Sequence, residues 1–451
     1  MISSKEGVSK EKSNALAQRR QDIAKSIHDV WTQGGSDLSG LAPALVDGRL
    51  DALGRYTMFS DFHDDIEQEP KNSPGLPSRD TSMSYEEFKR DFMLPNLPVM
   101  ITGLTEKWKA RKWLRKENET AVPDMSRLRK IFGSDSVPVH SQSQTGFTLS
   151  RPVKEDMTVS AYTDWWELHH SQIDDVDPEA PLLYLKDWRL VASHPKIEAY
   201  EWPIYFLDDW LNGAMGNAYK FVYLGPEGTS TRLHADVLRS FSWSTNVCGR
   251  KRWYLIPPEY TYLLMDCFGR QLAPHLHADV ELGVESLFPG LKYARRHAFV
   301  VVQEPGETIF VPSKWHHTVE NLAPTMSINH NWLNGANIRF SWEKLKAEIN
   351  ASDHSPRNDS TVASDAGGEQ VGDDLLLLWL VLARKARQIF NTNPSGGDEM
   401  AMFDLQAMLP ILQDIQVIIA DGKDLGFTDR CECDIDELIP SILDFLGEDA
   451  P

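Results

Sequence analysis

Side chains that can bind a metal ion occur in two separate segments of the sequence. In TRLHADV, His234 and Asp236 are separated by one residue, and on a strand such residues project from the same face. Far downstream, FVPSKWHHTVENL adds the imidazoles of His316 and His317. Two histidines and one carboxylate on one side of a metal leave positions open, as in non-haem Fe(II) oxygenases, whereas zinc favours a closed tetrahedron or a single open position. The spacing therefore predicts an iron site.

The sequence His-Ala-Asp-Val occurs a second time, at 277–280, and this copy provides an internal control. It lies in APHLHADVELG, a segment with Pro, Gly and Glu and without a strong strand pattern on either side. We therefore expect His275, His277 and Asp279 to be surface loop residues rather than ligands. The first copy lies between two convincing strand patterns, which favours it as the metal site.

A lysine downstream of the first copy could bind an anion. Lys251 begins the segment KRWYLIPP, in which alternation places Lys251, Trp253 and Leu255 on one face of a strand. A lysine that shares a face with two bulky apolar side chains requires an anionic partner, unless it extends to solvent at the rim. Thr231, three residues before His234, can add a hydroxyl group near the same pocket.

The elements that must position these residues are mostly predicted strands. Between about residues 180 and 332, short runs of Val, Ile, Phe, Tyr and Trp are broken by Gly-Pro turns, which indicates an all-β sandwich or barrel. Upstream, Ser84 and Glu87 form a capping-box signature, which predicts a short helix that ends by Pro95. The segment PNLPVMITGL (95–104) then predicts a buried strand.

Changes in composition divide the chain into four regions. Residues 1–80 are expected to form a partly helical N-terminal extension. Residues 81–348 are expected to form the main domain, which begins with helical and strand elements. Residues 350–373 are rich in Ser, Asp and Gly and poor in apolar side chains, so we expect a flexible linker. Residues 374–451 have the apolar density of packed helices, so we expect a C-terminal helical region.

The composition of the 451 residues argues against several functional classes. With 46 Lys and Arg against 66 Asp and Glu, the net charge is −20, which repels nucleic acid and anionic membranes but is compatible with a local basic patch. Four cysteines are too few for a disulfide framework, and the polar N-terminus does not resemble a secretory signal. We therefore expect a cytoplasmic or nuclear protein. The longest apolar run, 375–383, is too short to span a membrane and predicts a buried helix. Cys431 and Cys433 are expected in an ordinary acidic loop.

The motifs described above, in this order and with their flanking strands, resemble the JmjC family of 2-oxoglutarate-dependent oxygenases. The resemblance covers about residues 84–345 and includes Thr231, the His234-x-Asp236 pair, Lys251 with RWYLIPP, and EPGETIFVPSKWHHTVENL. It implies a mainly β fold with helical additions. The expected domain is a double-stranded β-helix of the jelly-roll or cupin-like type, flanked by N- and C-terminal helices.

The resemblance implies that His234, Asp236 and His317 bind Fe(II). In the family pattern the ligand is the third residue of a Trp-aromatic-His triplet, and His316 here occupies the aromatic position. The resemblance also implies that Lys251 pairs with the distal carboxylate of 2-oxoglutarate. The further cosubstrate residues that it implies are Thr231 and Tyr184 as hydroxyl partners, Trp243 in the pocket lining, and Asn329 or Asn331 in contact with the cosubstrate.

The implied activity is that of a protein oxygenase that uses Fe(II), 2-oxoglutarate and O2. Segments such as YLKDW (184–188) and FLDDWLN (206–212) resemble the compact hydroxylase-type branch of the family. That branch implies a lysyl hydroxylase acting on the eukaryotic translation termination (release) factor. Histone or protein lysine demethylation with the same cofactors stays open as an alternative. A non-catalytic binding protein of the same fold and a zinc hydrolase also stay open.

Overall fold

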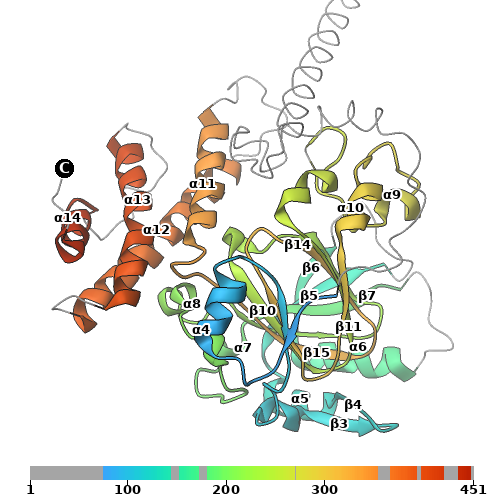
Figure 1. Ribbon diagram of the computed structural model, residues 1–451. Helices are drawn as coiled ribbons and strands as arrows, with labels where there is room; N and C mark the ends of the chain where they lie inside the picture. The colour runs from blue at the N-terminus through green and yellow to red at the C-terminus, as the bar shows by residue number, and fades with distance from the viewer. Residues whose placement is uncertain are drawn as a thin grey trace, which may run out of the picture.

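The structure, a computed structural model, describes residues 75–143, 152–171, 180–269, 271–353, 366–393, 398–420 and 435–447. Most of the predicted N-terminal extension lies outside these residues, and so do Cys431 and Cys433. In the described part of the chain, two β-sheets pack face to face and a layer of helices lies beside them (Figure 1). The predicted mainly β jelly roll with helical additions is confirmed.

Nine strands of the described chain form the larger sheet, in the order β1-β2-β13-β10-β15-β8-β7-β5-β6. Neighbouring strands are antiparallel, except that β1 and β2 are parallel. The strands are β1 (Ser78–Arg79), β2 (Val99–Ile101), β5 (Ser136–Gln142), β6 (Val153–Thr158), β7 (Leu182–Trp188), β8 (Lys220–Gly225), β10 (Phe241–Cys248), β13 (Thr308–Val311) and β15 (Thr325–Trp332). Every residue of β10 is buried, as expected for a central strand covered on both faces.

The smaller sheet of the described chain has four antiparallel strands in the order β12-β11-β14-β9. They are β9 (Ser230–His234), β11 (Lys251–Ile256), β12 (Phe299–Gln303) and β14 (His316–Asn321). A separate hairpin is formed by β3 (Leu114–Glu117) and β4 (Thr120–Pro123). The residues with candidate chemistry lie mostly on strands of the two large layers, so the packing of the sheets positions them.

The predicted start of the main domain is present in the structure. The side chain of Ser84 accepts a hydrogen bond from the backbone N–H of Glu87, and the Glu87 carboxylate accepts one from the Ser84 N–H at 2.8 Å. This capping box begins α4 (Tyr85–Phe88), and a π-helical turn, η2 (Lys89–Met93), ends before Pro95. The predicted strand within 95–104 is β2, whose residues are all buried.

The remaining helices connect the strands or cover the ends of the sheets. They are η3 (Lys109–Trp113), α5 (Met125–Phe132), α6 (Val159–Ser171), α7 (Leu190–Ser193), η4 (Ile204–Phe206), α8 (Trp210–Ala214), η5 (Val237–Arg239), η6 (Pro258–Leu264), α9 (Ala278–Glu281), α10 (Leu291–His297), α11 (Ile338–Asp353), α12 (Ala366–Thr392), α13 (Glu399–Ala420) and α14 (Ile435–Leu446). The last four form the layer beside the sheets (Figure 1).

The C-terminal helices share one apolar core with the edge of the barrel. Buried side chains of α11 to α14 form a cluster that also contains Trp210 and Leu211 of α8 and Leu238 of η5. The predicted buried helix at 375–383 is part of α12, where Leu378, Trp379 and Leu382 are fully buried. The helical layer is therefore packed against the barrel rather than attached by a chain connection alone.

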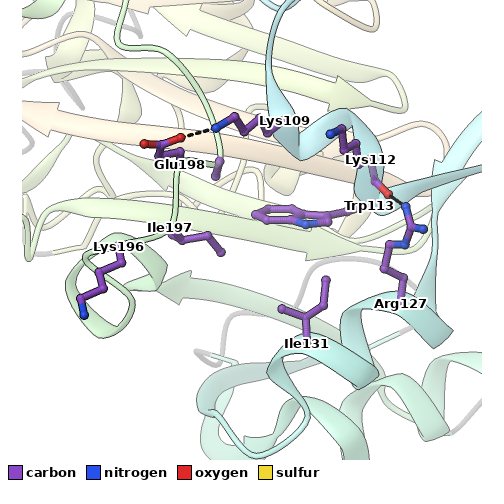
Figure 2. Close-up of a pocket in the computed structure, with 9 residues that line it drawn as sticks. Lys109, Lys112, Trp113, Arg127, Ile131, Lys196, Ile197 and Glu198 are labelled. Atoms are coloured by element: carbon purple, nitrogen blue, oxygen red, sulfur yellow. Dashed lines mark hydrogen bonds and ion pairs between the residues drawn. The ribbon is translucent and has the colours of Figure 1, made fainter.

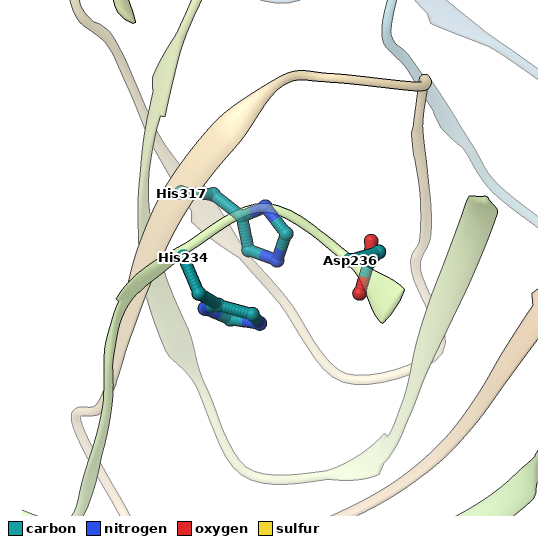
Figure 3. Close-up of side chains that lie close together, drawn as sticks. All are labelled: His234, Asp236 and His317. Atoms are coloured by element: carbon teal, nitrogen blue, oxygen red, sulfur yellow. The ribbon is translucent and has the colours of Figure 1, made fainter. Parts of the chain in front are cut away.

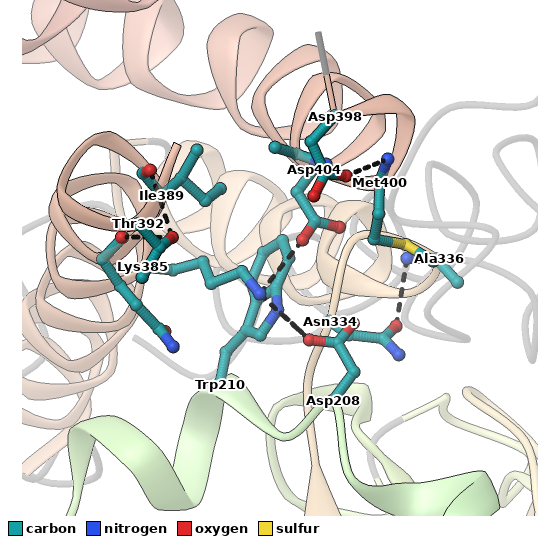
Figure 4. A network of polar contacts seen from close by, with 12 residues as sticks. Asp208, Trp210, Asn334, Ala336, Lys385, Ile389, Thr392, Asp398, Met400 and Asp404 are labelled. Carbon is teal, nitrogen blue, oxygen red and sulfur yellow. Dashed lines mark hydrogen bonds and ion pairs between the residues drawn. The ribbon is translucent and has the colours of Figure 1, made fainter. Parts of the chain in front are cut away.

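A partly buried ion-pair network joins the same two parts of the molecule (Figure 4). The Nζ atom of Lys385 lies 3.0 Å from Asp208 Oδ1 and 3.1 Å from Asp404 Oδ2. Trp210 Nε1 also donates to Asp208 Oδ1, at 2.9 Å. Burial opposes the charge on Lys385, but the two carboxylates outweigh it and raise the lysine pKa. Burial, together with the charge of Asp208, raises the pKa of Asp404 to about 6.

Helix α13 is long and apolar enough to cross a membrane if length and composition alone are considered. Its residues Leu405, Met408 and Leu412 pack in the core of the helical layer. Asp404, on the same helix, is 1% exposed and bound to Lys385. These contacts are those of a core helix in a packed layer.

Helix occupies both ends of the stretch predicted to be a flexible linker, 350–373. Helix α11 continues to Asp353, and α12 begins at Ala366. The predicted linker boundaries are therefore wrong at both ends. Packing of apolar faces supplies most of the stability of a helix in a protein, so helices anchored by Leu345 and Leu378 extend into segments of low intrinsic propensity.

Candidate metal centre

His234, Asp236 and His317 converge between the two sheets (Figure 3). One ligand atom from each side chain lies within 4.8 Å of the others. Strands β9 and β14 pair in a register that places His234 opposite His317, and the two ring centroids are 4.3 Å apart. The structure thus brings together the three residues that the family resemblance implies as ligands.

The position of Asp236 depends on the end of a strand. Strand β9 ends at His234, so Asp236 lies just beyond it rather than on it. The backbone of Asp236 nevertheless stays extended, with φ −58° and ψ 154°, which keeps the side chain on the side of His234. Its Oδ2 atom accepts a hydrogen bond from Ser242 Oγ at 2.6 Å. This hydrogen bond holds the carboxylate next to the two imidazoles.

Hydrogen bonds fix both imidazoles in the form that binds metal. His234 Nδ1 lies 2.7 Å from the Arg232 carbonyl oxygen, and His317 Nδ1 lies 3.1 Å from that of Trp315. A carbonyl only accepts, so each Nδ1 carries a proton, and Nε2 is the ring atom left to bind a metal. Burial, assisted by the neighbouring His317, lowers the pKa of His234 to about 4, so His234 is neutral at pH 7. Two imidazole nitrogens and a carboxylate oxygen fit the donor preferences of Fe(II).

A cavity between the sheets extends from the three ligands toward Lys251. Its lining comprises Tyr223, Thr231, His234, Asp236, Ser242, Trp243, Ser244, Lys251, Trp253, His317, Val319, Asn329 and Asn331. Of the predicted cosubstrate residues, Thr231, Lys251, Trp243 and both asparagines are in this set. Asn329 and Asn331 are two residues apart on β15 and both reach the cavity, so either can contact the cosubstrate.

Tyr184 is the one predicted cosubstrate residue that is absent from this lining. It is buried on β7, and its hydroxyl group is in hydrogen-bonding contact with the side chains of Thr231 and Asn321. Burial raises the pKa of Tyr184, so the phenol is neutral. The structure therefore places Tyr184 behind Thr231, where it can support that hydroxyl group.

Lys251 is buried rather than exposed at the rim. The residue is 2% exposed, and Nζ donates to Ser327 Oγ at 2.7 Å. Its neighbours Arg250 and Arg252 instead bind the outer carboxylates Glu304 and Glu320. In the described chain no carboxylate forms an ion pair with Lys251. Burial and the nearby charge of Lys186 lower the pKa of Lys251 to about 7. An entering carboxylate would stabilise the charged form.

Three residues near the cavity were not identified from the sequence. Ser242 holds the Asp236 carboxylate, and Ser327 accepts from both Lys251 and, at 3.1 Å, Asn329 Nδ2. Lys186 lies 5.7 Å from the Tyr223 ring, and Lys251 lies 5.8 Å from the same ring. Alternation along MSINHNW could have identified Ser327, which shares a strand face with Asn329. No pattern in the sequence identifies Ser242, because its role depends on the loop that carries Asp236.

The second His-Ala-Asp-Val copy contradicts the prediction of a surface loop. His275 and Asp279 are 3% and 4% exposed, and residues 278–281 form helix α9. Arg295 Nη1 pairs with Asp279 Oδ1 at 2.7 Å, which allows the carboxylate to be buried. His275 Nε2 lies 3.2 Å from Glu281 Oε2. Among the described residues, the metal-binding group contains His234, Asp236 and His317 and none of this second copy.

Comparison with known proteins gives a family match over most of the barrel. The cupin-like domain model matches residues 85–337. The arginine-specific demethylase JMJ20 of Arabidopsis thaliana is 36% identical over 303 residues, which are 63% of this chain and 62% of that protein. The 2-oxoglutarate and iron-dependent oxygenase JMJD4 is 38% identical over 292 residues in Danio rerio (63% of this chain, 67% of that protein). The Homo sapiens JMJD4 is 39% identical over 274 residues (59% of this chain, 63% of that protein). The chain thus spans 62 to 67% of the length of these relatives.

Proposed function

This chain belongs to the cupin-like family, and from that premise we propose that it is a protein oxygenase dependent on Fe(II) and 2-oxoglutarate. The observation that carries the proposal is one cavity with a His-Asp-His ligand set at one end and the buried Lys251 at the other. The ligand set suits iron, and the lysine suits the distal carboxylate of the cosubstrate. A zinc hydrolase would use the first feature and leave the second without a role.

Each residue of the cavity has a distinct part in this proposal. His234 and His317 bind the metal through Nε2, and Asp236 binds it through its carboxylate, which Ser242 holds by a hydrogen bond to Oδ2. Lys251 orients 2-oxoglutarate by its distal carboxylate, with Ser327 holding the ammonium group in place. The side chains of Thr231, Asn329 and Asn331 supply neutral hydrogen-bonding groups along the cavity wall.

Bound Fe(II), 2-oxoglutarate and O2 supply oxidative decarboxylation to succinate and CO2, with transfer of the second oxygen atom to a C–H bond of the substrate. The aromatic walls exclude bulk water from this chemistry. Trp243 is 1% exposed and stacks on Phe206 with ring centroids 5.4 Å apart. Trp253 covers His317 at a centroid distance of 5.6 Å. The chain therefore provides orientation and shielding.

For the substrate, we propose a lysine side chain of the translation termination release factor, hydroxylated in the cytoplasm without direct contact to nucleic acid. Support comes from the resemblance of the chain to the compact hydroxylase-type branch. The net charge of −20 also favours the approach of a cationic side chain.

Arginine demethylation is the second candidate, favoured by the 36% identity to a relative named as an arginine-specific demethylase. The same metal and cosubstrate serve both reactions, because a hydroxylated N-methyl group is a hemiaminal, whose C–N bond breaks to release formaldehyde and leave N–H. The two candidates differ in which carbon of the protein substrate reaches the metal.

Mass spectrometry distinguishes these candidates. The purified protein is incubated with Fe(II), 2-oxoglutarate, O2 and either the release factor or a methylated arginine peptide, and succinate is measured in parallel. Gain of one oxygen atom on a lysine supports the proposal, whereas loss of a methyl group with equal succinate supports the second candidate. Absence of succinate with every substrate and no binding of 2-oxoglutarate would overturn the oxygenase proposal itself.

A further inference from the structure

One segment of this acidic protein is strongly basic. Residues 107–130 contain nine Lys or Arg and three Asp or Glu, although the whole chain has a net charge of −20. The segment forms η3, the β3–β4 hairpin and α5, which lie together at one end of the molecule (Figure 1). Charge is therefore segregated on the surface, and a basic face of this kind attracts anionic partners.

The basic face contains a groove with an apolar floor (Figure 2). The groove has a volume of about 530 Å³ and is bordered by Lys109, Lys112, Arg127 and Lys196. Trp113 forms part of the floor. Two isoleucines, Ile131 and Ile197, complete the apolar surface, and Ile131 is 48% exposed. None of these residues lines the metal cavity.

Most of the positive charge around the groove is not neutralised by the protein. Lys109 pairs with Glu198, and Arg127 donates to the carbonyl oxygen of Lys112. Within the described residues, Lys112, Arg127 and Lys196 form no ion pair with a carboxylate. Three cations thus surround an apolar floor whose exposed part is Ile131, which is the arrangement that binds an acidic segment with an apolar side chain.

We propose that this groove is a docking site for an acidic segment of a partner protein that carries an apolar side chain between its carboxylates. The apolar side chain would lie on Trp113 and Ile131, and the carboxylates would pair with Lys112, Arg127 and Lys196. A nucleic acid fits less well, because Glu198 lies in the lining of the groove and the chain as a whole carries a net charge of −20, which repels an extended phosphate backbone.

The groove adjoins the wall of the metal cavity along the chain. Ala199, at the edge of the groove, accepts a backbone hydrogen bond from Ala110 at 2.6 Å. The next residue, Tyr200, contacts His330 through its hydroxyl group, and its ring centroid lies 6.2 Å from that of Trp243. A partner held in the groove would therefore lie beside an element that packs against the cavity wall. The docking proposal itself does not depend on the proposed oxygenase function.

Fluorescence anisotropy tests the docking site without iron or 2-oxoglutarate. The probe is a fluorescein-labelled peptide of aspartate and glutamate residues with two leucines, titrated with the full chain at low and high salt. We expect saturable binding that weakens with salt, and a loss of at least about tenfold in affinity in the double variant Lys112→Glu and Lys196→Glu. The variant Ile131→Ser should also bind this peptide more weakly. Its loss of affinity should be smaller for a second peptide in which alanine replaces each leucine.

A matched control carries the same change of charge elsewhere. Lys292 on α10 and Arg339 on α11 are exposed and lie away from the groove, so the double variant Lys292→Glu and Arg339→Glu should retain the wild-type affinity. Thermal unfolding of each variant establishes that it is folded. Three results would each overturn the proposal. The first is an equal loss of affinity in the two double variants, and the second is no binding of the peptide at low salt. The third is binding of a single-stranded RNA that is tighter than that of the peptide and depends on Lys112 and Lys196.

Discussion

The half-buried Lys385 and the fully buried Lys251 have opposite surroundings. Lys385 lies between Asp208 and Asp404 where the helical layer meets the barrel, and those carboxylates raise its pKa against the effect of burial. Lys251 lies inside the barrel, where its hydrogen-bond partner is the neutral hydroxyl of Ser327 and where burial lowers its pKa to about 7. The first cation is neutralised by the fold, and the second is not.

The difference shows how a structural charge can be distinguished from a ligand-binding one. A buried charge that serves packing is compensated when the chain folds, because an uncompensated charge in a low-dielectric interior is costly. A buried charge without a counter-ion keeps that cost until an anion binds. Lys251 is therefore expected to bind a carboxylate of a ligand. Lys385 already has two carboxylate partners within the protein.

The largest effect on activity is expected from substitution of a metal ligand, in the same cavity as Lys251. In Asp236→Ala, we expect bound iron and succinate production to fall by at least about 100-fold, because two imidazoles alone do not hold Fe(II) in the proposed geometry. Elemental analysis of the purified protein and a succinate assay measure these quantities. Asp164→Ala, on the exposed face of α6, should leave both unchanged. Full activity in Asp236→Ala would remove this carboxylate from the metal site.

Replacement of Lys251 by Met should separate affinity from stability. We expect the affinity for 2-oxoglutarate to fall by about 100-fold, because the distal carboxylate loses its buried counter-ion. The unliganded protein should at the same time become more stable by about 1–3 kcal/mol near pH 6, since an uncompensated charge is removed. Isothermal titration with 2-oxoglutarate and denaturant unfolding measure the two effects. A destabilised unliganded variant would contradict the comparison.

The same substitution predicts a pH dependence with a defined sign. The unfolded chain holds the Lys251 proton up to its ordinary pKa of 10.5, whereas the folded chain releases it near pH 7. Between these values the unfolded state binds more protons, so the wild type gains stability as the pH rises from about 7 to 10. The stability advantage of Lys251→Met should therefore shrink over this window. Unfolding curves of both proteins at several pH values test the prediction.

For Lys385 we expect the opposite result: its substitution should lower stability and leave the affinity for 2-oxoglutarate unchanged. Lys385→Met leaves Asp208 and Asp404 facing each other without a cation, so we expect a loss of about 2 kcal/mol in the free energy of unfolding. The affinity for 2-oxoglutarate should stay at the wild-type value, because the network lies outside the cavity. Denaturant unfolding and isothermal titration report the two quantities. An effect on affinity with no effect on stability would reverse the assignment of the two lysines.

The smallest effect is expected at Ser327, which positions Lys251. Ser327→Ala should weaken 2-oxoglutarate binding by about three- to tenfold, because Ser327 acts only through Lys251 and a typical hydrogen bond contributes about 0.5–1.5 kcal/mol. A suitable control is Ser341→Ala, because this buried serine donates to the carbonyl of Leu238 outside the cavity. We expect the control to lose stability but to retain affinity in the same titration. If Ser327→Ala and Ser341→Ala bind 2-oxoglutarate with equal affinity, Ser327 has a structural role only.

Sequence patterns predicted the strand-rich barrel and the capping box of α4, and with the family resemblance they predicted most of the cavity residues, but not Ser242. They succeeded where period-two alternation and turn residues act locally, as in KRWYLIPP and PNLPVMITGL. They failed for the second His-Ala-Asp-Val copy, which Arg295 allows to be buried, and for the ends of 350–373, where α11 and α12 continue. In both cases a distant part of the chain changed what the local sequence favoured.

By itself, the sequence determined which residue types are present: two imidazoles, one carboxylate and one lysine at strand spacing, in an acidic chain with a basic segment. Only the tertiary structure decided that β9 pairs with β14 so that His234 faces His317, and that Lys251 rather than Lys385 stays without a carboxylate partner. The physical reason is that local preferences act through backbone dihedrals and alternation, whereas the pairing of strands and the burial of charges depend on contacts between segments far apart in the chain.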